Sequence, residues 1–282
     1  MTNILIAIKN LIENPITNLV SHYRSTNRAN HMGDALEFYV KDIFCDTTLI
    51  EDVNEKNRIY AENFSYMGNQ NNPPDMIIRQ GDAIEVKKIE SLRSSLALNS
   101  SYPKNKLYSD SPLITDACKS CESWESKDII YMVGVSNDNN LKALWMIYGD
   151  CYAASKETYE NIKNKISAGI NELPNVEFAE TNELARVNKV DPLGITYLRI
   201  RGMWGIENPI KVFDYVASID EDAEFNLNVI MLEEKYLSFP LNDRQKIEEL
   251  INNNFSITNI KIKSPNNPAT LLNAKLLKFK KP

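Results

Sequence analysis

Two carboxylates and one lysine lie close together in the sequence, at a spacing that suits hydrolytic chemistry. Asp75 follows two prolines, and Glu85 and Lys87 are ten and twelve residues further on. Successive side chains of a β-strand point to opposite faces, so Glu85 and Lys87 share one face if residues 83–89 form a strand. A turn at residues 80–82 would fold that strand back on its predecessor. The carboxylate of Asp75, at the start of the preceding strand, then comes to lie beside Glu85.

Carboxylates aimed at one point repel each other unless a cation lies between them. Mg²⁺ is bound by one or two carboxylates together with water and phosphate oxygens. Such an ion lowers the pKa of a bound water and neutralises charge that develops on a phosphodiester during hydrolysis. Lys87 would hold or deprotonate the attacking water, or stabilise the scissile phosphate. Together the three side chains predict a hydrolytic site for phosphodiesters.

A surface hairpin whose acid and lysine only pair across solvent is the alternative interpretation, because the pattern Pro-Asp…Glu-x-Lys is permissive. Three features of the context favour the hydrolytic site. Ile84 and Val86 make the second strand amphipathic in the required phase, and Lys88 follows directly after Lys87. An upstream helix also carries Glu37, which can point towards the same place.

The elements that must position these residues follow from the spacing of apolar side chains. Spacings of three and four residues predict amphipathic helices at 4–12, 34–44, 156–170 and 242–251. Apolar runs and alternation predict strands at 59–67, 75–79, 83–89, 128–135, 143–148, 196–202 and 225–232, before a β-rich basic tail. This alternation predicts an α/β fold with a mixed β-sheet flanked by helices. Without a repeat or linker, we expect a single elaborated domain over residues 1–282.

Bulk composition excludes several classes of protein. The chain has 282 residues, of which 43% are apolar and 25% charged, as in soluble globular proteins. The longest apolar run, Ile129–Val135, is far shorter than the roughly 20 residues that cross a membrane. The N-terminus has no secretory signal, and the four cysteines have no disulfide-framework spacing, so we expect a cytoplasmic protein. Cys118 and Cys121 have redox spacing, but zinc is poorly supported without a second pair.

The net charge of −6 does not exclude a nucleic-acid partner, because binding depends on local charge. Residues 79–106 carry six basic side chains against three acids, and residues 186–211 carry five against two. After Glu249 the chain has six lysines and no acid. An acidic protein with basic walls is therefore possible, and composition alone does not decide it.

Several polar residues are candidates for contacting DNA. Arg199 and Arg201 are two apart on a predicted strand, so they share a face, and arginine is the preferred bidentate partner of guanine O6 and N7. A solvated strand face or phosphate clamps are the alternatives for this pair. The other candidates have polar or basic side chains that can bond phosphates and base edges, and one of them, Lys88, directly follows Lys87. They are Asn27, Arg28, Asn30, Lys88, Asn99, Ser100, Ser101 and Lys104.

Short strings of the sequence resemble a known family of nucleases. Pro74-Asp75 followed by Glu85-Val86-Lys87 resembles the PD-(D/E)xK nuclease signature. Longer strings, over a region from about residue 4 to residue 210, resemble the NgoPII type of type II restriction endonuclease. The strings that carry this resemblance are Asn27–Asn30, Gly33–Glu37, Asn72–Met76, Gly81–Ser91, Ala97–Ser101 and Thr196–Trp204.

The resemblance implies a fold, an activity and a set of site residues. It implies a PD-(D/E)xK core that cleaves double-stranded DNA at GGCC with Mg²⁺, works as a homodimer, and has a cytosine methyltransferase as its genetic partner. Carried over position by position, Asp75 and Glu85 are the metal ligands and Lys87 is the catalytic lysine. Glu37 matches the acid that many such nucleases place on a helix beside the site. The catalytic core would span about 30–150, with recognition elements at about 185–282.

Two other functions remain open at this point. One is a DNA-binding protein that kept the fold and lost the chemistry, against which the intact acids and lysine argue. The other is a structure-selective nuclease of repair or recombination, which would need no elements that contact bases. Because 282 residues far exceed a minimal nuclease core, the sequence favours the site-specific enzyme.

Overall fold

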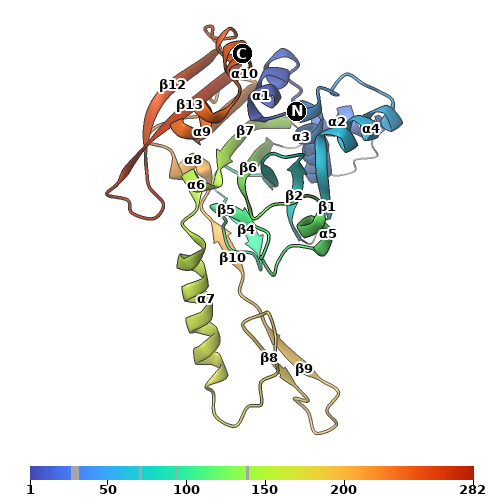
Figure 1. The fold of residues 1–282 in the computed structure, drawn as a ribbon, viewed down its shortest axis with the longest axis vertical. Helices are drawn as coiled ribbons and strands as arrows, with labels where there is room; N and C mark the ends of the chain where they lie inside the picture. The colour runs from blue at the N-terminus through green and yellow to red at the C-terminus, as the bar shows by residue number, and fades with distance from the viewer. Residues whose placement is uncertain (27–31, 70–71, 93, 138–139) are drawn as a thin grey trace.

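A nine-stranded mixed β-sheet forms the centre of the protein (Figure 1). The computed structural model describes residues 1–26, 32–69, 72–92, 94–137 and 140–282. The strand order is β1-β2-β3-β6-β7-β11-β13-β12, and β5 pairs with β6. Two pairs of neighbouring strands in this sheet are parallel, namely β3–β6 and β7–β11. The other pairs are antiparallel. The strands are β1 (Phe64–Asn69), β2 (Asn72–Ile78), β3 (Ala83–Ile89), β5 (Lys106–Tyr108), β6 (Ser126–Asn137), β7 (Asn140–Tyr148), β11 (Phe225–Leu232), β12 (Phe255–Lys263) and β13 (Leu271–Lys281).

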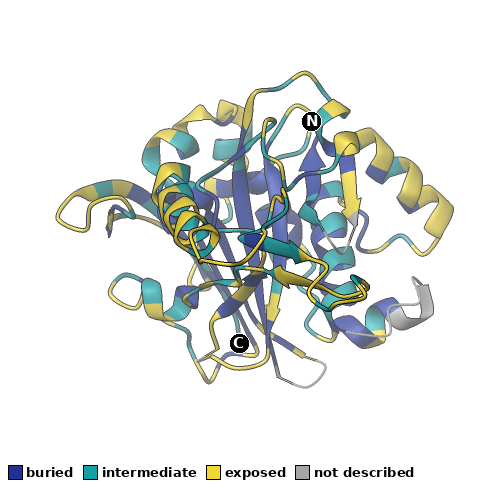
Figure 2. Ribbon diagram, turned by 90° about the horizontal axis from the view of Figure 1, so that it is seen from below, coloured by how far each residue is buried: buried dark blue, intermediate teal, exposed yellow. Residues whose placement is uncertain are grey.

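Helices flank this sheet, and the buried strands lie between more exposed elements (Figure 2). They are α1 (Ile4–Glu13), α2 (Leu19–Thr26), α3 (Met32–Cys45), α4 (Val53–Asn63), α5 (Asp116–Ser120), α6 (Gly149–Tyr152), α8 (Pro209–Val212), α9 (Glu233–Ser238) and α10 (Leu241–Glu248). α3 packs against β3 and β6, and α1 packs against α3. The expected α/β architecture, a mixed sheet flanked by helices, is confirmed. None of the described helices is both long and apolar enough to cross a membrane.

Most predicted elements are present, and one is wrong. The helices expected at 4–12, 34–44, 156–170 and 242–251 are found within a few residues, as are the strands of the central sheet. The strand expected at 59–67 is a helix as far as Asn63 and a strand only from Phe64. The side chain of Asp52 accepts a hydrogen bond from the Asn54 amide and starts α4, which local apolar spacing did not indicate. The two cysteines with redox spacing are free thiols, at and just after α5.

Glycine at position 134 sets the distance between α3 and the sheet. A Cβ atom there would lie 2.5 Å from Cδ2 of Leu36, so any larger residue would force the buried Leu36 side chain of α3 to shift. Leu36 is completely buried, and the next residue of the helix is Glu37. The glycine that interrupts the longest apolar run therefore positions the helix that carries a candidate catalytic acid.

A buried carboxylate ties α3 to α4. Asp42 of α3 is completely buried, and its oxygens accept hydrogen bonds from the side chains of Tyr23, Thr47, Lys56 and Tyr60. Lys56 and Tyr60 are four residues apart, on one face of α4, which explains why this segment is helical. The ion pair of Lys56 with Asp42 has an N–O distance of 2.5 Å. Every donor around Asp42 satisfies a charge that would otherwise be costly to bury.

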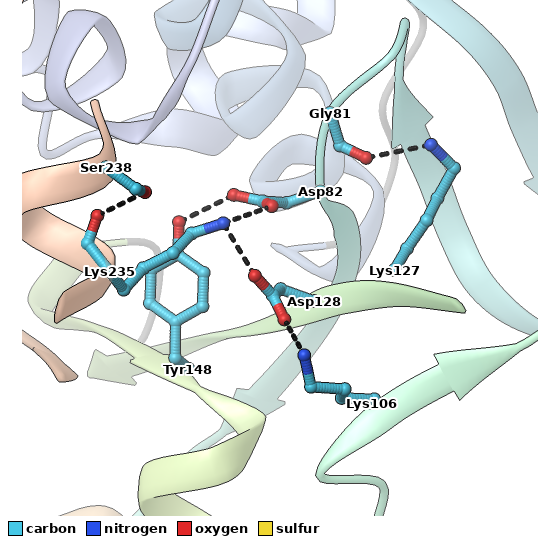
Figure 3. A network of polar contacts seen from close by, with 8 residues as sticks. All are labelled: Gly81, Asp82, Lys106, Lys127, Asp128, Tyr148, Lys235 and Ser238. Atoms are coloured by element: carbon cyan, nitrogen blue, oxygen red, sulfur yellow. Dashed lines mark hydrogen bonds and ion pairs between the residues drawn. The ribbon is translucent and has the colours of Figure 1, made fainter. Parts of the chain in front are cut away.

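A second network fastens the C-terminal third to the start of β3 (Figure 3). Nζ of Lys235, on α9, lies 2.7 Å from a carboxylate oxygen of Asp82 and 2.7 Å from one of Asp128. Asp82 also accepts from the hydroxyl of Tyr148, and Asp128 accepts from Nζ of Lys106. Asp82 comes directly before β3, three residues from Glu85. The network thus links β5, β6, β7 and α9 at one end of β3, the strand that carries Glu85 and Lys87.

An arm projects from the body of the protein (Figure 1). It consists of α7 (Lys156–Asn171) and a hairpin of β8 (Ala185–Asn188) and β9 (Tyr197–Ile200). The return segment, β10 (Trp204–Ile206), pairs with β4 (Leu96–Asn99) of the body. An aromatic cluster of Tyr102, Tyr159 and Trp204, with ring centroids 5.5–6.1 Å apart, fastens the base of the arm to the body.

The buried Asp42 network predicts a stability effect. Lys56→Met leaves the Asp42 carboxylate buried without its counter-charge, so we expect a loss of about 3–5 kcal/mol in the free energy of unfolding. Arg58→Met on the same helix breaks the exposed ion pair with Glu62 and should cost less than about 1 kcal/mol. Urea denaturation of both variants measures the difference. Equal losses would show that Lys56 does not neutralise Asp42.

Candidate active site

The hairpin of β2 and β3 brings the predicted residues together. Met76 is paired with Ile84 in antiparallel register, which places Asp75 next to Glu85. The Val86 amide donates to Oδ2 of Asp75 at 2.6 Å. Nζ of Lys87 lies 2.5 Å from Oε1 of Glu85, so these two side chains share a face as the strand alternation predicted.

The charges of this cluster are unbalanced. Burial and the neighbouring charge of Glu85 raise the pKa of Asp75 to about 7. Burial disfavours the Lys87 ammonium, but the charges of Glu85 and Asp75 outweigh this effect and raise the pKa of Lys87. The lysine therefore stays protonated at neutral pH, and one ammonium faces two carboxyl groups. A second positive charge would relieve the remaining repulsion.

Glu85 has the free lone pairs that such a cation needs. Glu85 is only 8% exposed, and its Oε2 atom accepts no hydrogen bond from any described residue. A buried carboxylate oxygen without a partner is unusual and costly. The two carboxylates fit a hard divalent cation, with water and phosphate oxygens as the other ligands. In the described ranges, no group of three or more acids, histidines or cysteines forms a complete metal cage.

Glu37 of α3 belongs to the same electrostatic environment. Burial raises the pKa of its carboxyl group, and the charges of Lys87 and Glu85 also act on it. The predicted third acid is therefore near the cluster, but it makes no hydrogen bond or ion pair with the other described site residues. It does not line the cleft into which the hairpin opens.

A cleft of about 840 Å³ lies over the hairpin, between the body and the arm. Asp75, Glu85 and Lys87 are at one side of it, and Arg199 and Arg201 of the arm are at the other. Its charged lining has five basic and four acidic side chains: Lys87, Lys163, Arg186, Arg199 and Arg201, and Asp75, Glu85, Glu180 and Glu183. In a chain of net charge −6, this is a local excess of positive charge.

The predicted polar loop also lines this cleft. Asn99, Ser100 and Ser101 are among the lining residues. Asn99 has a φ of 53°, a left-handed conformation that asparagine tolerates, and it pairs with Trp204 of β10. The loop is therefore held between the catalytic strand and the segment that follows the arginines.

Three groups of predicted DNA contacts remain, and two of them, Lys88 and Lys104, lie outside the cleft. Lys88 is on the other face of β3 from Lys87 and pairs with Glu90 outside the cleft. Lys104 is 6% exposed, and burial lowers the pKa of its ammonium to about 8. It donates to Oγ of Ser101 and so supports the loop from behind. The third group, Asn27, Arg28 and Asn30, lies outside the described residues.

The two arginines share one carboxylate. Nε and Nη2 of Arg199 donate to the two oxygens of Glu183 at 2.9 and 2.6 Å, and Nε of Arg201 donates to Oε1 of the same residue. Hydrogen bonding from Arg199 lowers the pKa of Glu183, which is therefore ionised at neutral pH. The predicted strand at 196–202 is shorter in the structure, so Arg199 is on β9 and Arg201 directly follows it; both side chains still point the same way, towards Glu183, and both sides of β9 are largely exposed.

Sequence reasoning missed Glu183, Lys163 and Arg186 as cleft residues. Arg186 is opposite Arg199 in the β8–β9 pair. A turn signal was available for this hairpin, because Asp191-Pro-Leu-Gly194 separates its two strands. Glu183 and Lys163 had no local signal, because only the arm's folding brings them to the cleft.

Comparison with known proteins identifies the family. A model of the NgoPII restriction endonuclease family matches residues 2–263. The chain is 53% identical over 280 residues to the type II restriction enzyme NgoPII of Neisseria gonorrhoeae, an alignment that covers 98% of this chain and 99% of that protein. No solved structure matches it. Since both similarities extend over nearly the whole chain, the protein belongs to the NgoPII restriction endonuclease family.

Proposed function

We propose that this protein is a type II restriction endonuclease that hydrolyses phosphodiester bonds of double-stranded DNA at a specific sequence. The observation that carries the proposal is the arrangement of Asp75, Glu85 and Lys87 at the side of a cleft opposite two arginines. Family membership supports it. The core would be a PD-(D/E)xK nuclease fold, which the hairpin and the adjoining helix α3 support.

The side chains of the hairpin have distinct roles in this reaction. Asp75 and Glu85 would hold Mg²⁺, for which the unpartnered Oε2 of Glu85 is available. When bound, the ion would neutralise phosphate charge and acidify a coordinated water. Lys87, which stays protonated beside Glu85, would stabilise negative charge on the scissile phosphate. Glu37 would add to the negative field that attracts the cation.

The arm and the polar loop would read the DNA sequence. We propose GGCC as the recognition site, as the family resemblance implies. Arg199 and Arg201 would contact guanine O6 and N7 in the major groove, and Asn99, Ser100 and Ser101 would contact phosphates or base edges near the cut. A cytosine methyltransferase would protect the same sequence in a host cytoplasm.

We also propose that the active form is a homodimer. GGCC has two-fold symmetry, and a symmetric pair of active sites can cut both strands in one encounter. The arm offers apolar surface for a second subunit, because Ile162 and Ile166 of α7 and Leu198 of β9 are 47–51% exposed.

The catalytic assignments predict which variants lose cleavage. Asp75→Ala, Glu85→Ala and Lys87→Ala should each slow single-turnover cleavage of plasmid DNA by about 10²–10⁴-fold, since each acts on the metal or the transition state. Binding to the same DNA should change little. Lys119→Ala, an exposed lysine outside the cleft, should cleave normally. Discrete bands support a site-specific enzyme, whereas cleavage of branched DNA alone, or none by the wild type, contradicts it.

The raised pKa of Asp75 predicts a pH-dependent stability of the metal-free protein. Its pKa of about 7 exceeds the value of about 3.9 in an unfolded chain, so stability is lost as the pH rises through 7. Asp75→Asn removes this loss and keeps an oxygen for the Val86 amide. Its melting temperature should exceed that of the wild type at pH 8, by more than at pH 5.

Mg²⁺ provides the second half of this test. At pH 8, added Mg²⁺ should raise the melting temperature of the wild type and not that of Asp75→Asn. Asp116→Asn, at a fully exposed position, should behave as the wild type throughout. Equal stabilisation of both proteins by Mg²⁺ would rule out Asp75 as the metal ligand, and a pH-independent difference in melting temperature would contradict the raised pKa of Asp75.

The dimer is tested by its stoichiometry on DNA. Sedimentation of the protein with a duplex that holds one GGCC site, in Ca²⁺ to prevent cleavage, should give two chains per duplex. Ile166→Glu should reduce this to one chain, because it places a charge in the apolar contact. Asn164→Glu, which adds the same charge to a polar position of α7, should leave two. One wild-type chain per duplex would overturn the proposal.

A further inference from the structure

Among the described residues, Glu183 is the one carboxylate that contacts both Arg199 and Arg201 in the cleft. It comes from the segment before β8, 16 and 18 residues from its partners. Its side chain is 18% exposed, whereas those of Arg199 and Arg201 are 45% and 49% exposed. The carboxylate is thus placed behind two guanidinium groups that remain open to the cleft.

The paired arginines keep donors for a ligand. A guanidinium has five N–H groups, and Arg199 uses only Nε and Nη2 for Glu183, while Arg201 uses only Nε. The Nη1 groups of both arginines therefore have no acceptor among the described residues. Shared binding to one carboxylate also limits how the two side chains can rotate.

The carboxylate changes which acceptors the arginines favour. Phosphate is anionic, so its approach to this group is opposed by the charge of Glu183. The O6 and N7 atoms of guanine are uncharged acceptors, so their approach meets much less opposition. We propose that Glu183 is a positioning residue for sequence specificity, which holds Arg199 and Arg201 as readers of guanine and disfavours their use as phosphate clamps. The inference rests on the proposed function and deepens it.

If Glu183 raises specificity by disfavouring phosphate contacts, removing its charge should increase binding to DNA of any sequence. Glu183→Gln keeps the size of the side chain and an oxygen acceptor, but it removes the charge. The exposed ion pairs contribute little to stability, so this variant should fold. The arginines then become free to bind phosphates at any sequence.

Glu180 provides a matched control. It lines the same cleft three residues before Glu183, and none of the described ion pairs joins it to an arginine. Glu180→Gln therefore removes the same charge from the same wall without releasing an arginine. Any general effect of a less acidic cleft on DNA affinity appears in both variants.

The experiment is a set of binding titrations without Mg²⁺, with a GGCC duplex and a random duplex, at several salt concentrations. Glu183→Gln should bind the random duplex at least about tenfold more tightly than Glu180→Gln does and lower the specificity ratio by a similar factor. On random DNA, the slope of the logarithm of its binding constant against the logarithm of salt concentration should be steeper by about 1–2, because one or two more phosphates are contacted.

The outcomes separate this inference from the proposed function. Equal ratios and salt slopes in Glu183→Gln and Glu180→Gln would overturn the role of Glu183, even if the wild type prefers GGCC. A wild type that binds no DNA would overturn the proposed function and the inference with it. If the wild type binds DNA without preferring GGCC, the salt slopes on random DNA still decide whether Glu183 restrains the arginines.

Discussion

The mutual repulsion of Asp75 and Glu85 is the constraint around which the protein is built. Adjacent strands hold these carboxylates together where little water reaches them, and one lysine does not balance them. Such a pair persists only if the surrounding structure fixes it. That rigidity comes from the wide sheet, from α3 packed against Gly134, and from the network of Lys235 at the start of β3.

The structural carboxylates of Asp42 and Asp82 differ from the carboxylate of Glu85 in how completely they are hydrogen-bonded. Both oxygens of Asp42 accept hydrogen bonds, and so do both oxygens of Asp82. Oε2 of Glu85 has no partner although it is buried. A buried acid that is fully bonded can contribute to the fold, but it has no lone pair left for a ligand. Oδ1 of Asp150, outside the cleft, is also buried without a partner among the described residues, so the free oxygen of Glu85 distinguishes the candidate active site only together with Asp75 and Lys87 beside it.

Charge is also distributed between the two sides of the cleft. The body presents carboxylates that suit a cation, and the arm presents arginines that suit a nucleic acid. Aromatic packing and the pairing of β4 with β10 fix the base of the arm, so the polar loop and the segment that follows the arginines are joined directly to the body. In the proposed function, these short connections would couple the arm's position on the DNA to the position of the scissile bond.

The sequence by itself determined the features that depend on neighbours in the chain. Strand alternation and a short turn were enough to place Glu85 beside Lys87 and Asp75 beside Glu85, and apolar spacing was enough for α1, α3 and most strands. The tertiary structure alone decided that residues 59–63 are helical, because Lys56 and Tyr60 reach Asp42 from α4. It also decided that Glu183 binds Arg199 and Arg201 and that Lys104 is buried outside the cleft, whereas strand alternation already turns Lys88 to the face opposite Lys87. Periodicity reports which face of an element a side chain occupies, whereas its partners depend on segments far away in the sequence that only the folded chain brings together.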